Sequence, residues 1–349
     1  MAIELSSLTF TNQADIVPVS GTEQILNTGI VNTLAGSDII TGTGTGRFSI
    51  LNSGSINTGD GNDIITGIRN ENEDTINIGG AGIRNEQGTI DTGDGNDTIA
   101  GTGRAGDGLF TNVGTIDTGD GNDIITGTAI DSGINVNYLG TINTGNGNDI
   151  ITGTGGYGIQ NYFTINTGDG NDKITGNATL TGGYGIINSS TSAGGAMYTG
   201  AGNDIITGTS TNGWGIFNYS DSTIDTGDGN DIITGTGGWY GIYNNGSIDT
   251  KNGNDSIIAE GGFGGLGSVF LGNGKDYLKG FGSGNFNGGN GKDTLELTSG
   301  SYTIGISGTT VNFTNGSTIM KTSEFEKLIA GSKTYDFNSL TDGQTIIVA

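Results

Sequence analysis

The sequence predicts an all-β protein. We expect a parallel β-solenoid, similar to a β-helix or β-roll, with about eleven coils of roughly 25 residues and a small carboxy-terminal β-rich cap. Three observations predict it: an acidic, glycine-rich turn recurs along the chain, apolar residues hold register with that turn, and helical periodicity is absent. The 72 glycines also disfavour long helices. A stack of one coil per repeat follows.

The turn has the consensus Thr-Gly-Asp-Gly-Asn-Asp, and its last aspartate marks each repeat. This aspartate occurs at Asp38, Asp63, Asp97, Asp123, Asp149, Asp172, Asp204, Asp231, Asp255, Asp276 and Asp293. An apolar residue stands two positions after it and another seven positions before it in every copy, as Ile65 and Ile56 do around Asp63. The residue directly after the aspartate varies between apolar and polar types. We therefore expect the two apolar columns to face inward and the variable column to face outward.

A second motif, Gly-Ile-x-Asn, lies between successive turns, as at Gly158–Asn161 and Gly215–Asn218. Together with the β-branched residues around the turns, it predicts about three short strands per coil. Its asparagines should stack as a structural amide ladder rather than bind a ligand; they are Asn52, Asn85, Asn161, Asn188, Asn218 and Asn244.

We expect three segments along the chain. Residues 1–27 should form an amino-terminal cap, residues 28–296 the solenoid, and residues 297–349 a carboxy-terminal cap. A repeat array grows in one dimension, so 349 residues need not divide into separate globular domains. The amino terminus lacks the basic patch and apolar run of a signal peptide, and no stretch is long enough to cross a membrane.

The charge balance is strongly acidic. The chain has 36 acidic and 12 basic residues and no histidine, for a net charge of −24, which argues against nucleic acid and anionic membranes as partners. It has no cysteine, which excludes disulfides and thiolate metal sites. Carboxylates stacked roughly 4.8 Å apart repel by about 1 kcal/mol in water and about 3.5 kcal/mol at an effective dielectric near 20. Divalent ions between the turns would turn this repulsion into attraction.

Each turn offers a carboxylate and several backbone carbonyls, which glycine allows to converge. Two stacked turns would supply about six oxygens, a donor set that suits Ca²⁺. We expect one ladder of roughly 8–10 calcium ions. The expected metal-binding residues are Gly59, Asp60, Gly61, Asp63, Gly93, Asp94, Gly95, Asp97, Gly119, Asp120, Gly121, Asp123, Gly145, Asn146, Gly147, Asp149, Gly168, Asp169, Gly170, Asp172, Gly200, Ala201, Gly202, Asp204, Gly227, Asp228, Gly229, Asp231, Gly253, Asp255, Gly272, Gly274, Asp276, Gly289, Gly291 and Asp293. The turn before Asp38 is too degraded to be included.

The turn resembles the glycine-rich nonapeptide of the RTX family, the hemolysin-type calcium-binding repeat Gly-Gly-x-Gly-x-Asp-x-U-x, in which U is apolar. Gly288–Glu296 matches it at every position, and the internal copies within about 28–296 match from the second glycine onward. Two features depart from the family. Threonine usually replaces the first glycine, and the spacing is near 25 residues instead of nine or eighteen. The usual roll of this family carries two ion ladders. These departures indicate that this chain carries one ion ladder, along a wider solenoid.

The resemblance implies a secreted protein, similar to surface proteins of cyanobacteria and other Gram-negative bacteria. It implies type I secretion, with an uncleaved export signal within 297–349. The expected function is that of a calcium-binding structural solenoid that folds on extracellular calcium, acts at the cell surface or in the matrix, and assembles into fibres or a surface layer. Metal binding and folding would then be one equilibrium.

Two alternatives keep calcium but add another partner. Thr-Gly-Thr follows many turns, as at Thr126–Thr128 and Thr152–Thr154, and outward threonine pairs on a flat face resemble those of ice-binding solenoids. Aromatic residues gather between residues 157 and 243, and the 25-residue spacing of Trp214 and Trp239 should place one above the other. If these aromatics are exposed, they form a self-association strip or an adhesin surface for polysaccharide. If they are buried, they fill the core.

Catalysis is not expected. A β-helical enzyme that modifies an acidic polysaccharide needs basic groups to neutralise a carboxylate and a base that removes a proton. The four arginines, Arg47, Arg69, Arg84 and Arg104, lie on separate coils, and there is no histidine. A polysaccharide-modifying enzyme is therefore the third alternative.

Overall fold

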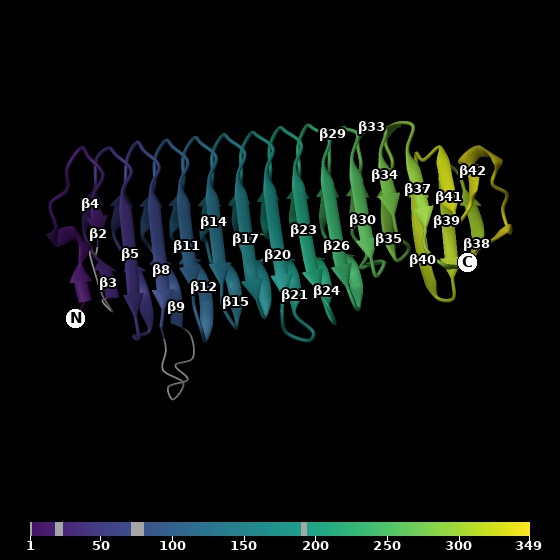
Figure 1. The fold of residues 1–349 in the computed structure, drawn as a ribbon. Coiled ribbons are helices and arrows are strands. Elements are labelled where there is room, and N and C mark those ends of the chain that lie inside the picture. The colour runs from purple at the N-terminus through teal and green to yellow at the C-terminus, as the bar shows by residue number, and fades with distance from the viewer. Residues whose placement is uncertain (1, 18–23, 71–79, 190–193) are drawn as a thin grey trace.

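The computed structural model describes residues 2–17, 24–70, 80–189 and 194–349. It confirms the parallel β-solenoid: three long sheets run along one rod, and from β3 to β34 each coil contributes one strand to each sheet (Figure 1). Two short 3₁₀ helices, η1 (Leu5–Ser7) and η2 (Phe337–Ser339), lie near the ends of the chain.

The first sheet has eleven strands and contains the Gly-Ile-x-Asn motif. In spatial order its strands are β1 (Ala2–Glu4), β3 (Gln24–Asn27), β6 (Phe48–Asn52), β9 (Gly80–Glu86), β12 (Gly106–Asn112), β15 (Ser132–Asn137), β18 (Tyr157–Asn161), β21 (Tyr184–Asn188), β24 (Trp214–Asn218), β27 (Tyr240–Asn244) and β31 (Phe263–Gly264).

The second sheet has fifteen strands and immediately precedes the acidic turns. Its strands are β4 (Ile30–Asn32), β7 (Ser55–Asn57), β10 (Thr89–Asp91), β13 (Thr115–Asp117), β16 (Thr141–Asn143), β19 (Thr164–Asn166), β22 (Ala196–Tyr198), β25 (Thr223–Asp225), β28 (Ser247–Asp249), β32 (Ser268–Phe270), β35 (Gly284–Asn287), β40 (Thr318–Ser323), β39 (Thr310–Asn315), β38 (Gly300–Ser307) and β43 (Thr345–Val348).

The third sheet has fourteen strands and immediately follows the turns. Its strands are β2 (Ile16–Val17), β5 (Ile39–Gly44), β8 (Ile64–Arg69), β11 (Thr98–Thr102), β14 (Ile124–Thr128), β17 (Ile150–Gly155), β20 (Lys173–Ala178), β23 (Ile205–Ser210), β26 (Ile232–Gly237), β30 (Ser256–Glu260), β34 (Tyr277–Lys279), β37 (Thr294–Leu297), β41 (Lys327–Ala330) and β42 (Lys333–Asp336). A small sheet of β29 (Asn252–Gly253), β33 (Asn273–Gly274) and β36 (Asn290–Gly291) runs through the last turns.

The core is a narrow stack of isoleucines, as the two apolar columns predict. Ile56 of the second sheet and Ile65 of the third sheet are completely buried, and so is Ile83 of the first sheet. Identical positions stack in register, so Ile125 lies opposite Ile151 in the neighbouring coil. The residue after the turn aspartate faces outward, since Ile64 is 38% exposed. This strict register places every acidic turn at the same corner of the rod, between the second and third sheets.

The predicted amide ladder is also present. The Nδ2 of Asn52 donates to the Oδ1 of Asn85 at 2.8 Å, and Asn188 donates to Asn218 at 2.9 Å. The ladder is interrupted in two coils, where Thr111 and Val136 stand in register with the asparagines. Each asparagine is buried at a bend and satisfies backbone carbonyls there, so its role is structural.

The two ends differ from the expected boundaries in one respect. Strands β1, β2 and β3 already pair in parallel with strands of later coils, so the stacking begins well before residue 28. The sequence gives only one sign of this, Asp15 followed two residues later by the buried Val17, because the first coil lacks the glycine-rich turn. At the other end, β38, β39, β40 and β43 pair antiparallel, while β40 and β41 continue the parallel stacking onto β35 and β37. No helix among the described residues is long and apolar enough to span a membrane.

Candidate metal centre

A continuous column of buried carboxylates runs along the corner between the second and third sheets. Its members are the turn aspartates predicted from the sequence, and each of them from Asp38 to Asp293 is at most 1% exposed. In each coil the chain leaves the second sheet, makes the glycine-rich turn, and re-enters the third sheet one residue after the aspartate. The short turn and the buried isoleucine two residues later direct the aspartate inward.

One carboxylate oxygen of each aspartate is used to join the coils. The backbone N–H of Asp97 donates to the Oδ1 of Asp123 at 2.8 Å, and the N–H of Asp123 donates to the Oδ1 of Asp149 at 2.8 Å. The same hydrogen bond, between 2.7 and 2.9 Å long, links every neighbouring pair from Asp38 to Asp293. The aspartate carbonyls are satisfied as well, since that of Asp97 accepts the N–H of Ile124 at 2.8 Å.

The second oxygen has no such partner. The Oδ2 atoms of ten aspartates are buried and accept no hydrogen bond; they belong to Asp63, Asp97, Asp123, Asp149, Asp172, Asp204, Asp231, Asp255, Asp276 and Asp293. The nearest possible donors are the turn threonine hydroxyls, which lower the pKa of the carboxyls without satisfying them fully; Thr118 Oγ1, for example, also donates to the carbonyl of Thr144 at 3.4 Å. A buried carboxylate oxygen without a donor is costly, and a column of them requires a compensating group.

Without a cation, burial raises the pKa of these carboxyls above the ordinary value of 3.8. Removal from water is the largest cause, and the hydrogen bond from the preceding aspartate N–H opposes it only in part. The pKa of Asp97 and that of Asp172 rise to about 7, and that of Asp123 rises to about 6. The neighbouring carboxylates add repulsion in the same direction.

The carbonyl oxygens of the turns stack along the same corner of the rod. A Cβ added to Gly93 would lie 2.3 Å from the carbonyl oxygen of Gly59, and one added to Gly95 would lie 1.5 Å from that of Gly61. The carbonyl oxygens of one turn are thus directed at the glycines of the next turn. Gly93 also has a left-handed φ of 77°, which favours glycine independently. Close stacking and backbone conformation together explain the two glycine columns of the predicted site.

The donor set fits a hard cation. No three acidic side chains gather closely enough to hold a metal by themselves anywhere in the described ranges, so backbone oxygens must complete a site. One orphaned carboxylate oxygen per layer together with converging carbonyls is the chemistry that Ca²⁺ accepts. These residues therefore fit the calcium ladder expected from the sequence.

The other predicted acidic residues of the turns do not join the buried column. The side chains of Asp60, Asp94, Asp120, Asp169 and Asp228 are exposed, as are those of Asn146 and Ala201 at the equivalent position. Their backbone is nevertheless used, because the carbonyl of Asp120 accepts the N–H of Gly95 at 2.8 Å. Five of the turns carry two acidic residues, and the turn backbone directs only the second one inward.

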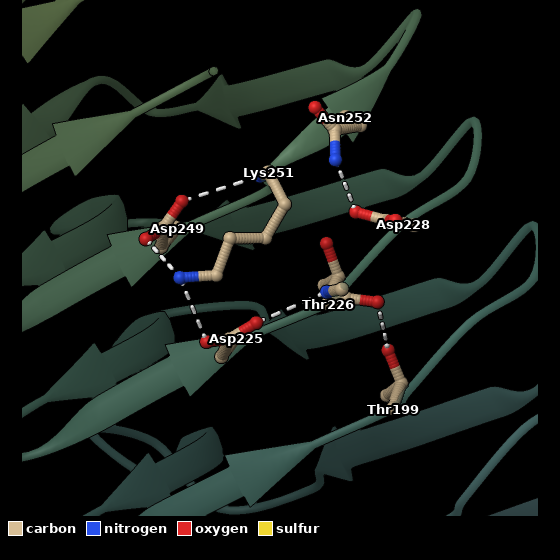
Figure 2. Close-up of polar contacts among 8 residues, drawn as sticks. Thr199, Asp225, Thr226, Asp228, Asp249, Lys251 and Asn252 are labelled. Atoms are coloured by element: carbon tan, nitrogen blue, oxygen red, sulfur yellow. Dashed lines mark hydrogen bonds and ion pairs between the residues drawn. The ribbon is translucent and has the colours of Figure 1, made fainter. Parts of the chain in front are cut away.

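A lysine provides a built-in cation beside the column. Lys251 stands where most turns have glycine, with a φ of 60°, and its ammonium lies between the carboxylates of Asp249 and Asp225 (Figure 2). The Nζ–Oδ2 distance to Asp225 is 3.1 Å. Asp225 and Asp249 are in register on β25 and β28, and the amide Nδ2 of Asn252 similarly donates to the exposed Asp228 at 2.6 Å (Figure 2). This lysine is not among the residues predicted for the site, although its place at a glycine position is a sequence signal for it.

The aromatic cluster lies on the outer face of the first sheet. Tyr184 stacks on Tyr157 with a centroid separation of 5.7 Å and on Trp214 with one of 4.6 Å. Trp214 is in register with Tyr240, so Trp239 does not stack directly above it. Instead Trp239 meets Trp214 edge to face at 4.3 Å and 89°, and it is 52% exposed. The rings therefore do not fill the core; they contact one another on the outer face, where Trp239 and Tyr240 remain exposed.

Two of the arginines, Arg47 and Arg84, lie near the same aromatic ring although they belong to separate coils. The guanidinium of Arg84 lies over the rings of Phe48 and Phe110, at 5.1 and 4.2 Å from their centroids, and Arg47 lies 5.2 Å from that of Phe48. These cation–π contacts occupy the outer face of the first sheet, away from the buried carboxylates.

The chain resembles known proteins only at the level of its fold. No protein-family model matches the chain. No curated protein matches it either. Among solved structures, the chain is similar to a hyperactive, Ca²⁺-dependent, β-helical antifreeze protein from an Antarctic bacterium, with 20% sequence identity and a TM-score of 0.39, over 83% of this chain and 72% of that one. At this level nothing about binding or activity transfers from that protein to this chain.

Proposed function

We propose that this protein is a calcium-binding structural solenoid, secreted to the cell surface or the extracellular matrix, that becomes stable when calcium fills the column of turn aspartates. The observation that carries the proposal is the row of ten buried Oδ2 atoms without a hydrogen-bond partner. Calcium would neutralise these carboxylates where the isolated protein retains protons. In the RTX proteins that the turn resembles, the same kind of repeat binds calcium.

The extracellular location follows from the expected affinity. Sites made of one carboxylate per layer and backbone carbonyls resemble extracellular calcium modules, whose dissociation constants are about 10⁻⁴ to 10⁻³ M. Cytosolic calcium is too low to fill them, so the chain would travel unfolded and fold outside the cell. In this proposal residues 297–349 contain the type I export signal in addition to forming the cap.

Assembly is part of the proposal. Strands β1, β2 and β4 begin the three sheets, so each presents one strand edge at the amino-terminal end of the rod. Such edges favour pairing with a second copy of the chain, and hence fibres or a surface layer. Sedimentation velocity over a range of protein concentrations in calcium tests this: a monomer at every concentration would contradict it.

The central experiment is a calcium titration of metal-stripped protein followed by far-UV circular dichroism and thermal unfolding, with magnesium as the control. We expect a cooperative gain of β structure and a higher melting temperature that are specific for calcium. A spectrum and melting temperature that are indifferent to calcium would mean that the isoleucine core suffices, and would overturn the proposal.

Ice binding is the second candidate, and one observation favours it. Thr126 and Thr128 of β14 lie in register with Thr152 and Thr154 of β17, and they alternate with the buried Ile125 and Gly127, so the threonine pairs face outward in regular rows. Measured thermal hysteresis, lost when Thr128 and Thr154 are replaced by tyrosine, would support this function. A calcium-loaded protein without hysteresis excludes it.

A further inference from the structure

The hydrogen-bonded column of carboxylates does not stop at Asp293. The N–H of Asp293 donates to the Oε2 of Glu326 at 2.7 Å, just as the N–H of Asp276 donates to the Oδ1 of Asp293 at 2.9 Å. Glu326 lies directly before β41, which pairs in parallel with β37 so that Leu328 stands opposite Leu295. In this register Glu326 takes the place of the turn aspartate in one more layer.

The loop that carries Glu326 also follows the backbone of a solenoid turn. The carbonyl of Asp293 accepts the N–H of Lys327 at 3.0 Å, as the carbonyl of Asp276 accepts the N–H of Thr294 at 2.8 Å. The N–H of Gly288 donates to the carbonyl of Ser323 at 2.9 Å. Glu324 has a left-handed φ of 57°, a conformation that the solenoid turns give to glycine. The cap thus covers the last turn with a turn of its own.

Unsatisfied oxygens remain at this junction. Asp293 is completely buried, and its Oδ2 accepts no hydrogen bond. The carboxylate of Glu326 is the direct neighbour of Asp293, whose N–H it accepts at 2.7 Å, and Glu326 itself is exposed. A neutral acceptor would serve the N–H of Asp293 equally well. A carboxylate at this point adds a second charged oxygen ligand beside the unpartnered Oδ2 of Asp293, a pairing that suits a hard cation.

The opposite end of the column is closed differently. The N–H of Asp15 donates to the Oδ1 of Asp38 at 2.6 Å, and the hydroxyl of Thr33 donates to the Oδ2 of the same carboxylate. Both oxygens of Asp38 are therefore satisfied by neutral donors. One layer further, Asp15 takes the place of the turn aspartate before β2, and its own carboxylate accepts the N–H of Thr11 at 2.7 Å. The amino-terminal end therefore also finishes in a carboxylate, but one with a neutral donor, whereas the last layer adds Glu326 beside an Oδ2 without a donor.

We propose that Glu326 is a metal ligand: with Asp293 and the carbonyls of turn 288–293 it forms a terminal Ca²⁺ site that fastens the carboxy-terminal cap to the solenoid. This inference rests on the proposed function, in which the buried column binds calcium. It assigns to the cap a residue that the nonapeptide pattern does not include, and it makes docking of the cap dependent on calcium.

The test compares Glu326→Gln with the matched control Glu324→Gln, two residues away on the same loop. Glutamine at 326 keeps an oxygen that can accept the N–H of Asp293 and removes only the charge. Bound calcium is counted after equilibrium dialysis, and hydrogen exchange is measured with and without calcium. We expect Glu326→Gln to lose one ion and the calcium-dependent protection of β41, while protection at Asp123 and Asp149 is kept. Glu324→Gln should behave as the wild type.

A conservative variant guards against a trivial folding defect. Glu326→Asp keeps the charge with a shorter reach, so it should retain the ion with at least tenfold weaker affinity for that site. If the wild-type protein fills its calcium ladder but Glu326→Gln keeps the same number of bound ions and the same protection of β41, only the terminal site is overturned. A wild-type protein that binds no calcium would overturn the proposed function and the terminal site together.

Discussion

The backbone N–H of Asp123 donates a 2.8 Å hydrogen bond to the Oδ1 of Asp149 in the next coil, while the Oδ2 of Asp149 has no hydrogen-bond partner. One carboxylate thus performs two tasks. Its Oδ1 fixes the register between neighbouring coils, and its Oδ2 can coordinate a cation. The two tasks respond differently to substitution, which allows them to be separated.

Replacement of Asp149 by asparagine should separate them. The amide oxygen can still accept the N–H of Asp123, but the buried charge is gone. We expect Asp149→Asn to be as stable as the wild type, or more stable, in metal-stripped protein, and to be destabilised by about 1–3 kcal/mol in calcium. Chemical unfolding in both conditions measures this. The control is Asp120→Asn, whose side chain is exposed; an equal loss in both variants would contradict a special role for the buried column.

Stability of the metal-stripped protein should fall as pH rises. The folded-state pKa of Asp97 is about 7 and that of Asp123 is about 6, against 3.8 for the unfolded chain, so the folded state binds more protons between these values. The stabilisation is complete below about pH 4 and is lost as pH rises through 6 to 7. Calcium must displace these protons, so its affinity should instead rise over the same range. Thermal unfolding from pH 5 to 8, with and without calcium, checks both signs.

Gly121 should not tolerate a side chain. A Cβ there would lie 1.5 Å from the carbonyl oxygen of Gly95, so the two turns would have to move apart. We expect Gly121→Ala to lower stability by at least about 1–3 kcal/mol and to weaken calcium binding. Gly308→Ala is the control, because Gly308 also has a left-handed φ, of 62°, but no atom within 4 Å of the added Cβ. Its loss should be limited to about 1–2 kcal/mol of backbone strain.

Lys251 allows charge and strain to be measured separately. Lys251→Met removes the ammonium between Asp225 and Asp249; because Lys251 is 41% exposed, the loss should be under about 1 kcal/mol and should shrink in high salt. Lys251→Gly removes the same charge but also relieves the left-handed φ of 60°. The glycine variant should therefore be about 1 kcal/mol more stable than the methionine variant. Equal stability of the two would show that the backbone at this position is not strained.

Much of this architecture can be predicted from the sequence because the same pattern of residues recurs in every repeat, so each repeat supports the same prediction. The inward position of Ile65 and Asp63 and the outward position of Ile64 are consequences of strand alternation. The exposure of the Asp60 side chain is harder to predict. Asp60 and Asp63 have the same side chain, and only the conformation of the turn backbone determines which of them is exposed. The pairing of Trp214 with Tyr240 was missed because spacing alone does not resolve a shift of one residue.

Glu326 illustrates a different limit. It is followed two positions later by the buried Leu328, as Asp293 is by Leu295, but no glycine-rich turn precedes it. Its place in the column depends on the cap folding back to pair β41 with β37, a contact between segments about 33 residues apart. The repeat pattern alone therefore cannot predict that Glu326 joins the column.

The register between coils has a consequence for the history of the chain. Asp97, Asp123 and Asp149 are separated by 26 residues each and bond to one another in the same way. Excision of residues 124–149 would join Asp123 to Ile150 and give each surviving strand a neighbour like the one it lost. Loss or duplication of one such unit would therefore shorten or lengthen the rod by a whole layer while its cross-section stays constant.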